Sequence, residues 1–259
     1  MYNSEENRII DGVRYLSNPE DQVFNDELYI NLRKKEGRLY NNDELKVLPD
    51  VKDGHPLRIE WEIRKKTAQK LISYFSGFKE KNILEIGCGN GWLSNMIAEK
   101  TDNNITALDL NEFELKQAAN VFRNKGKLTF IYGNILENIF TQNSFDFILF
   151  AGSIQYFNNL PELFNRLFNY LANVGEIHIV DSNFYKKNEI QQAKMRTKKY
   201  YESVGFAEMI KYYHHHDWNE IKKYNHKLMN PYGIRFSKMF NSVSGTRRNI
   251  FPWIAIKKP

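Results

Sequence analysis

The stretch most able to do chemistry is a glycine cluster at residues 85–92, which reads Glu-Ile-Gly-Cys-Gly-Asn-Gly-Trp. It joins an apolar run over residues 82–86, which we expect to be a strand, to a helical pattern that begins at Trp92. A glycine-rich turn between a strand and a helix lets the backbone pass close to a nucleotide-like ligand. The cluster therefore predicts a binding site for such a ligand.

Two kinds of ligand compete for this turn. A dinucleotide site has a third glycine at the sixth position for close helix–strand packing, whereas Trp92 stands there and Gly91 falls one residue early. Glu85, two residues before the first glycine, would repel a pyrophosphate. S-adenosylmethionine instead carries a positive sulfonium and an amino group, so a carboxylate beside the turn favours this ligand.

A second acid stands at the end of the next predicted strand. Asp109 follows Glu85 by 24 residues. At that place a carboxylate can accept hydrogen bonds from both ribose hydroxyls of the ligand. The alternative is that Asp109 only places a negative charge before the helix that starts at Asn111.

Several segments carry a family resemblance. Residues 82–99 resemble motif I of the class I S-adenosylmethionine-dependent methyltransferases, and Asp109 resembles the acid of their second motif. The other matching segments are residues 132–135, 145–171 and 175–181. The resemblance covers about residues 60–205 and implies S-adenosyl-L-methionine as the cofactor, with S-adenosyl-L-homocysteine as its product.

The resemblance also implies which residues bind the cofactor. They are Glu85, Gly87, Cys88, Gly89, Asp109, Leu110, Asn134, Ile135, Ala151 and Gln155. Asn134 departs from the family, where Asp is common at the adenine-contacting position, and the alternative is a loop residue that caps the next turn. Arg64 can meet the cofactor carboxylate in a bidentate manner, or it is a surface charge.

Methyl transfer needs the acceptor in line with the methyl group, and a base where the acceptor carries a proton. The candidate catalytic residues are His214, His215, His216 and Tyr156. Histidine titrates near neutrality, which suits a general base. Asp217 can orient one of the histidines, and the alternative is that Asp217 caps a helix behind surface histidines. We expect no metal site.

The elements around these residues alternate between strand and helix. The expected strands cover residues 82–86, 105–108, 128–132, 145–150 and 176–181, and the helices between them residues 92–100, 111–124 and 160–171. Such alternation is typical of a parallel sheet with helices on both faces. We therefore predict an α/β fold: a doubly wound, Rossmann-like, mostly parallel sheet of seven strands. The last two strands, near residues 226–229 and 253–256, would be antiparallel at its edge.

The chain divides into a lid and a core in this interpretation. We expect residues 1–57 to form an N-terminal helical cap, with a helix over residues 21–35. Residues 58–259 would form the S-adenosylmethionine-binding core, with a histidine-rich insert near residues 206–225.

The composition excludes several classes of protein. No apolar stretch of about 18 residues occurs, which argues against a membrane span. The polar, acidic start lacks the profile of a signal peptide, so we expect a cytoplasmic protein. Cys88 is the single cysteine, which excludes an internal disulfide and a multi-cysteine metal site.

The charge is uneven along the chain. Residues 186–259 carry sixteen Lys and Arg against five Asp and Glu. A basic third of this kind attracts phosphates through its summed field, or it is simply a solvated surface.

The leading hypothesis is a methyltransferase acting on O or N of a small-molecule acceptor. One alternative is an RNA methyltransferase that uses the basic third, although no RNA-binding module is evident, so nucleic acid is not the expected partner. Another is a non-catalytic binding protein with this fold, and a nicotinamide oxidoreductase ranks last. We expect no membrane partner, and the acceptor and oligomeric state stay open.

Overall fold

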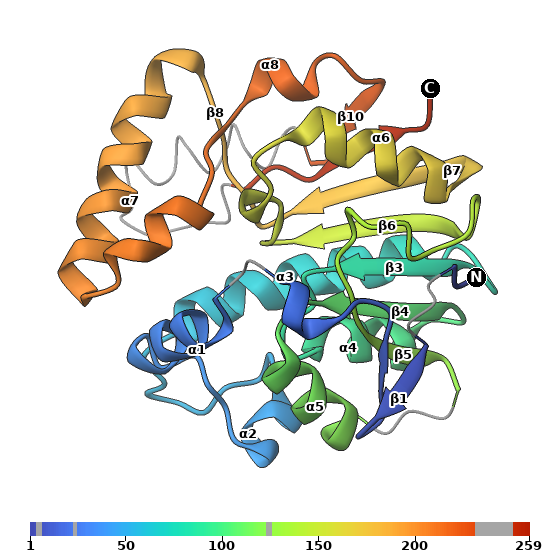
Figure 1. Cartoon of the computed structure of the whole chain (residues 1–259), viewed down its shortest axis with the longest axis horizontal. Coiled ribbons are helices and arrows are strands. Elements are labelled where there is room, and N and C mark those ends of the chain that lie inside the picture. The colour runs from blue at the N-terminus through green and yellow to red at the C-terminus, as the bar shows by residue number, and fades with distance from the viewer. Residues whose placement is uncertain (4–6, 23–24, 123–125, 231–250) are drawn as a thin grey trace.

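The computed structural model describes the chain except for residues 4–6, 23–24, 123–125 and 231–250 (Figure 1). The strands are β1 (Arg8–Ile10), β2 (Val13–Tyr15), β3 (Asn82–Ile86), β4 (Asn104–Asp109), β5 (Leu128–Tyr132), β6 (Phe145–Ala151), β7 (Leu171–Val180), β8 (Phe184–Tyr185), β9 (His216–Asp217), β10 (His226–Leu228) and β11 (Ile254–Lys257). The α-helices are α1 (Asp26–Lys35), α2 (Asn42–Val47), α3 (Arg58–Phe75), α4 (Trp92–Lys100), α5 (Glu112–Val121), α6 (Leu160–Tyr170), α7 (Ile190–Val204) and α8 (Trp218–Ile221). The 3-10 helices are η1 (Pro19–Asp21), η2 (Ile154–Tyr156), η3 (Lys187–Glu189) and η4 (Ala207–Tyr212).

Within the described residues, one large sheet has the strand order β1-β2-β5-β4-β3-β6-β7-β11-β10. The strands from β2 to β7 in this order are parallel to their neighbours. Strand β11 is antiparallel to β7, and β10 is antiparallel to β11. The prediction of a mostly parallel, doubly wound α/β sheet with two late antiparallel strands at its edge is confirmed.

The N-terminal region differs from the helical lid that the sequence suggested. Strands β1 and β2 form a hairpin, and β2 pairs with the edge of β5, so the sheet has two strands more than the predicted seven. The hairpin turns at Asp11 and Gly12, whose φ angles of 52° and 82° are both positive, as in a type I′ turn. Tyr15 on β2 is buried and stacks on Tyr132 of β5 at 5.2 Å between ring centroids. Apolar packing therefore draws part of residues 1–57 into the core sheet, and the described helices of this region are η1, α1 and α2.

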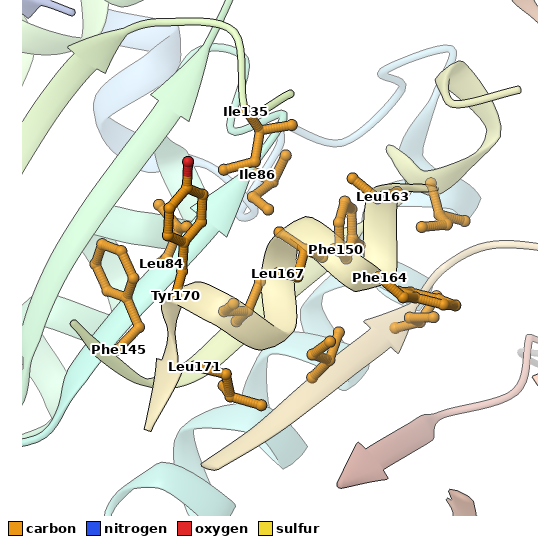
Figure 2. Packing of buried hydrophobic residues seen from close by; sticks show 14 of the residues in the cluster. Leu84, Ile86, Ile135, Phe145, Phe150, Leu163, Phe164, Leu167, Tyr170 and Leu171 are labelled. Atoms are coloured by element: carbon orange, nitrogen blue, oxygen red, sulfur yellow. The ribbon is translucent and has the colours of Figure 1, made fainter. Parts of the chain in front are cut away.

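Each face of the sheet has its own hydrophobic core, because side chains alternate along the strands. Ile83, Phe147 and Leu149 pack with α3 and α4. Leu84 and Phe150 point to the other face, where Leu163, Phe164 and Leu167 of α6 cover them (Figure 2). The helices on both faces fix the strand ends at which the glycine cluster lies.

A smaller cluster joins α1 to α7 and η4, which are distant from α1 in the sequence. Leu32 of α1 is buried with Tyr201 of α7 and Met209 of η4. We call α1, α7 and η4, with the residues to His214 that follow η4, together the cap. In Figure 1 the cap lies on the left, the side toward which the arrowheads of β6 and β7 point. The cap therefore stands at the carboxyl end of the parallel strands.

Two features of the remaining chain bear on function. None of the helices that the structure describes is long and apolar enough to cross a membrane. Four of the sixteen Lys and Arg in the basic third lie in residues 231–250, outside the described residues.

Candidate cofactor and acceptor site

A cavity of about 990 Å³ lies at the carboxyl ends of β3, β4 and β6. Every residue predicted to bind the cofactor lines it: Arg64, Glu85, Gly87, Cys88, Gly89, Asp109, Leu110, Asn134, Ile135, Ala151 and Gln155. Tyr156 and His214 also line the cavity, whereas His215 and His216 do not. Residues of the cap complete the wall, so one space is bounded by the glycine loop and by the cap.

The glycine loop has a conformation that other residues adopt only under strain. Gly87 and Gly91 have φ angles of 75° and 72°, in the left-handed region. A Cβ on Gly87 would stand 2.5 Å from Cβ of Ser153, and one on Gly91 would stand 2.5 Å from the ring of Phe130. The loop needs glycine at these positions because β3 turns sharply into α4 between tightly packed neighbours.

Asp109 ties the glycine loop to the end of β4. Its carboxylate accepts hydrogen bonds from the amide of Gly89 at 2.7 Å and from the amides of Leu110 and Asn111 at 2.8 Å. Burial raises the pKa of Asp109, and these three amides oppose that shift. A carboxylate offers about four acceptor positions, so the geometry leaves acceptor capacity for a ligand hydroxyl. The helix that follows, α5, is capped by the side chain of Asn111 and not by Asp109: the Asn111 side chain accepts a hydrogen bond from the amide of Glu114 at 2.8 Å.

Glu85 is a buried acid in the cavity wall. It is 3% exposed and accepts a hydrogen bond from the hydroxyl of Ser94. Burial raises the pKa of Glu85 to about 8, and the negative charge of Asp109 adds to this shift. A positively charged ligand in the cavity would stabilise the carboxylate form of Glu85.

Arg64 forms an ion pair with Glu60, its neighbour on α3. Its Nε lies 2.9 Å from Oε1 of Glu60, and Arg38 holds the same carboxylate through two contacts of 2.6 and 2.7 Å. Burial alone would raise the pKa of Glu60, but the hydrogen bonds of Arg38 and the charge of Arg64 lower it to about 2. Trp61 beside them is buried and packs edge-on against Trp92 at 5.2 Å.

The remaining cofactor candidates hold the loops around the cavity. The side chain of Asn134 accepts from the amide of Leu136 at 3.1 Å, which is the turn-capping contact considered as its alternative. Gln155 donates to the carbonyl of Gly152 at 2.5 Å. Cys88 is buried, and burial raises the pKa of its thiol, so the thiol is neutral near pH 7.

The three adjacent histidines have different surroundings: neighbouring side chains of an extended segment point to opposite sides, which separates His215 from His214, and His216 is buried. His214 faces the cavity, and its amide donates to the carbonyl of Gln155 at 2.8 Å. The Nε2 of His215 lies 2.9 Å from the hydroxyl of Thr197, and His215 itself does not line the cavity. His216 is buried with Nε2 3.3 Å from the carbonyl of Ile154. Of the three histidines, His214 is the one that lines the cavity and therefore remains the candidate general base.

His214 and His215 both have pKa values below that of free histidine. Burial and the positive charges of His216 and Lys194 lower the pKa of His214. The same kinds of cause lower the pKa of His215 to about 4. Asp217 does not orient a histidine but caps α8, since its side chain accepts from the amide of Asn219 at 2.8 Å.

Tyr156 packs edge-on between two other aromatic rings. The ring centroids of Tyr29 and Tyr213 lie 6.3 and 6.2 Å from that of Tyr156. Burial raises the pKa of Tyr156, so its phenol stays protonated near neutral pH. Tyr156 is therefore suited to hydrogen bonding and shaping the cavity, and not to removing a proton.

The sequence profile of the family described as "Methyltransferase domain" matches residues 78–229, more than half of the chain. The chain belongs to this family. The resemblance to the class I S-adenosylmethionine-dependent methyltransferases is thereby confirmed. The matched range includes the glycine loop, Asp109, Tyr156 and His214.

A curated relative is malonyl-[acyl-carrier protein] O-methyltransferase 1 of Ilyobacter polytropus, 30% identical over 118 residues, which cover 45% of this chain and 44% of that protein. The chain thus spans under half the length of this relative. Among solved structures, geranyl diphosphate C-methyltransferase of Streptomyces coelicolor has a TM-score of 0.57 at 14% identity and covers 91% of this chain and 98% of that one. Phosphoethanolamine N-methyltransferase 2 of Haemonchus contortus, solved with S-adenosyl-L-methionine, has a TM-score of 0.58 at 16% identity and covers 93% and 61%. The two structures show the same fold.

Two residues of α1 that line the methyltransferase cavity did not stand out as a pair in the sequence. Tyr29 and Arg33 are four residues apart, so they share one helix face. The guanidinium of Arg33 lies 5.7 Å from the ring centroid of Tyr29 and 3.4 Å from Glu114 of α5. The spacing was visible, but nothing in the sequence told which face of α1 meets the cavity.

The described residues contain no group of three or more His, Cys, Asp and Glu that could hold a metal ion.

Proposed function

We propose that this methyltransferase moves a methyl group from S-adenosylmethionine to O or N of a small-molecule acceptor. The observation that carries the proposal is one shared cavity, which is bounded by the glycine loop with Asp109, by Tyr156 of η2 and by the cap with His214. Cofactor and acceptor would therefore share one space, as a direct displacement requires.

The sheet residues would hold the cofactor, which supplies a methyl group activated by the sulfonium. Asp109 would accept from a ribose hydroxyl while it keeps Gly89 in place. Glu85 would face the positive charge of the cofactor, and this accounts for an acid whose present side-chain partner is a neutral hydroxyl. Arg64 would reach the cofactor carboxylate from α3, with its orientation set by Glu60.

The cap would cover the acceptor, and His214 and Tyr156 would act on the acceptor. His214 is neutral near pH 7 because burial lowers its pKa, so it can take a proton from the acceptor. Tyr156 would position the acceptor through its protonated phenol. In this proposal α1 together with α7 and η4 forms the lid over the acceptor.

Transfer of labelled methyl groups tests the proposal. The protein is incubated with methyl-labelled S-adenosylmethionine and, in separate reactions, with a mixed small-molecule extract and with total RNA. We expect label in the small-molecule fraction only, and its loss with His214→Asn. Label in the RNA would favour the RNA methyltransferase alternative. Cofactor binding without any transfer would favour a non-catalytic binding protein.

A further inference from the structure

Charged residues of both signs line the cavity. The ends of β3 and β4 contribute the acids Glu85 and Asp109. The cap contributes the cations Arg33, Arg196 and Lys211. The acids suit the cationic cofactor, but the cations of the cap have no role in that account.

The cap cations have few acidic partners. The cavity wall holds three further acids, Asp21, Glu36 and Glu162, and Glu36, directly after α1, is paired with Arg38 at 3.0 Å. Among the described residues, neither Arg196 nor Lys211 has an ion pair within 4.0 Å. Both side chains belong to exposed residues that also line the cavity, which places them at its mouth.

Arg33 lies deeper and has unused donors. Its ion pair with Glu114 is 3.4 Å long, and its Nε is shielded from solvent without a hydrogen-bond partner. A guanidinium has five N–H donors in a planar fork that fits a carboxylate or phosphate through two parallel bonds. An unmatched buried donor costs free energy, which a bound anion would recover.

We propose that Arg33 anchors an anionic group of the methyl acceptor, a carboxylate or a phosphate, and that Arg196 and Lys211 attract this group at the cavity mouth. The proposal rests on the proposed methyltransferase function, since it names the chemistry of the acceptor in the same cavity. A cationic acceptor would meet three positive side chains on the cap and is disfavoured. The anchor is separate from the atom that receives the methyl group.

Anion binding to the protein saturated with S-adenosylhomocysteine tests the proposal. Inorganic phosphate, acetate and tetramethylammonium chloride are titrated at pH 7 and constant ionic strength, and binding is followed by the rise in unfolding temperature. We expect phosphate or acetate to bind and tetramethylammonium not to bind. Arg33→Gln should lower the affinity for the anion roughly tenfold or more, because a charge-assisted bidentate contact is lost.

Two further variants control the experiment. Arg58→Gln removes an exposed arginine that is paired with Asp53 outside the cavity, so anion binding should stay unchanged. Arg196→Gln alters an exposed residue and should lower the affinity for the anion by a smaller factor than Arg33→Gln. This variant keeps the test valid even if Arg33→Gln does not fold.

The outcomes separate the two proposals. Tighter binding of phosphate than of acetate assigns a phosphate anchor, and the reverse order a carboxylate. Equal anion binding by the wild type and both arginine variants of the cavity contradicts the anchor, as does tetramethylammonium binding in place of the anions. Weaker S-adenosylhomocysteine binding by Arg33→Gln also contradicts it, since Arg33 would then serve the cofactor. Failure of the wild type to bind S-adenosylhomocysteine contradicts the methyltransferase function itself.

Discussion

The cavity has two walls that the chain builds in different ways. We call the ends of β3 and β4 with the glycine loop the sheet wall. Its contacts are made largely by the backbone, such as the amide of Gly89 on Asp109 and the close approach of Gly87 to Ser153. The cap is held by side chains of α1 on one hand and of α7 and η4 on the other, and α1 is far from the other two in the sequence.

The difference suggests a division of labour. A wall set by backbone geometry tolerates little change and suits the cofactor, which is common to the whole family. A wall made of tyrosine, arginine and histidine side chains changes with single substitutions and suits the choice of acceptor. Substitutions in the sheet wall should therefore act on folding and cofactor binding, and those in the cap on turnover.

The largest effect is expected for Gly87→Ala in the sheet wall. The new Cβ would collide with Ser153, and the positive φ would be strained, at a combined cost of about 3–5 kcal/mol in the free energy of unfolding. Gly54→Ala is the matched control: its φ is 84° but nothing lies within 4 Å, so we expect a loss of only about 1 kcal/mol. Denaturant unfolding measures both, and equal losses would show that the loop is not tightly packed.

His214→Asn tests the cap. We expect turnover to fall about a hundredfold with unchanged affinity for S-adenosylhomocysteine, because a general base is lost and the sheet wall is untouched. In the wild type, activity should fall as the pH drops through the His214 pKa, which lies below its usual value, since the protonated ring cannot accept a proton. His215→Asn, outside the cavity, serves as the control. Similar turnover of both variants would remove His214 from catalysis.

Asp109→Ala should weaken the binding of S-adenosylhomocysteine by about 2 kcal/mol, because a charged acceptor is lost and the amide of Gly89 loses its hydrogen-bond partner. Calorimetric titration measures this affinity. Asp102→Ala, an exposed acid paired with Lys127, should leave it unchanged. Unaltered affinity in Asp109→Ala would refute its place in the cofactor site.

The smallest effect concerns the pH dependence of stability. The folded pKa of Glu85 is about 8, against 4.5 for an ordinary glutamate. Between these values the folded state binds more protons than the unfolded state, so the free energy of unfolding should fall as the pH rises. In Glu85→Gln the fall should be smaller by about 1 kcal/mol for each pH unit between pH 5 and 7. Identical slopes in thermal unfolding would show that Glu85 is already ionised in the ligand-free protein.

The sheet wall was predictable because its signals are local. The apolar run of β3 and the glycines that follow it are adjacent in the sequence, and Asp109 ends the next strand in register. The hairpin at residues 8–15 was missed, although Asp11-Gly12 between apolar residues is a strong hairpin signal. Its strands of three residues are too short to show a clear period.

The cap could not be assembled from the sequence for a physical reason. Arg33 and His214 meet the same cavity only because α1 packs on α7 and η4 through Leu32, Tyr201 and Met209. Helical periodicity shows that α1 has an apolar face but does not identify the partner of that face. The run of three histidines likewise gave no sign of which ring faces inward.

The most direct test of the central claim is thermal unfolding with and without S-adenosylhomocysteine, with NAD as the control ligand. At a hundred times its dissociation constant, a ligand of the folded state adds about 2.7 kcal/mol of stability. For a chain of this size, that corresponds to a rise in Tm of roughly 5–10 °C. We predict this rise with S-adenosylhomocysteine and none with NAD. No rise with saturating S-adenosylhomocysteine, or a rise with NAD alone, would contradict the assignment of the glycine loop to S-adenosylmethionine.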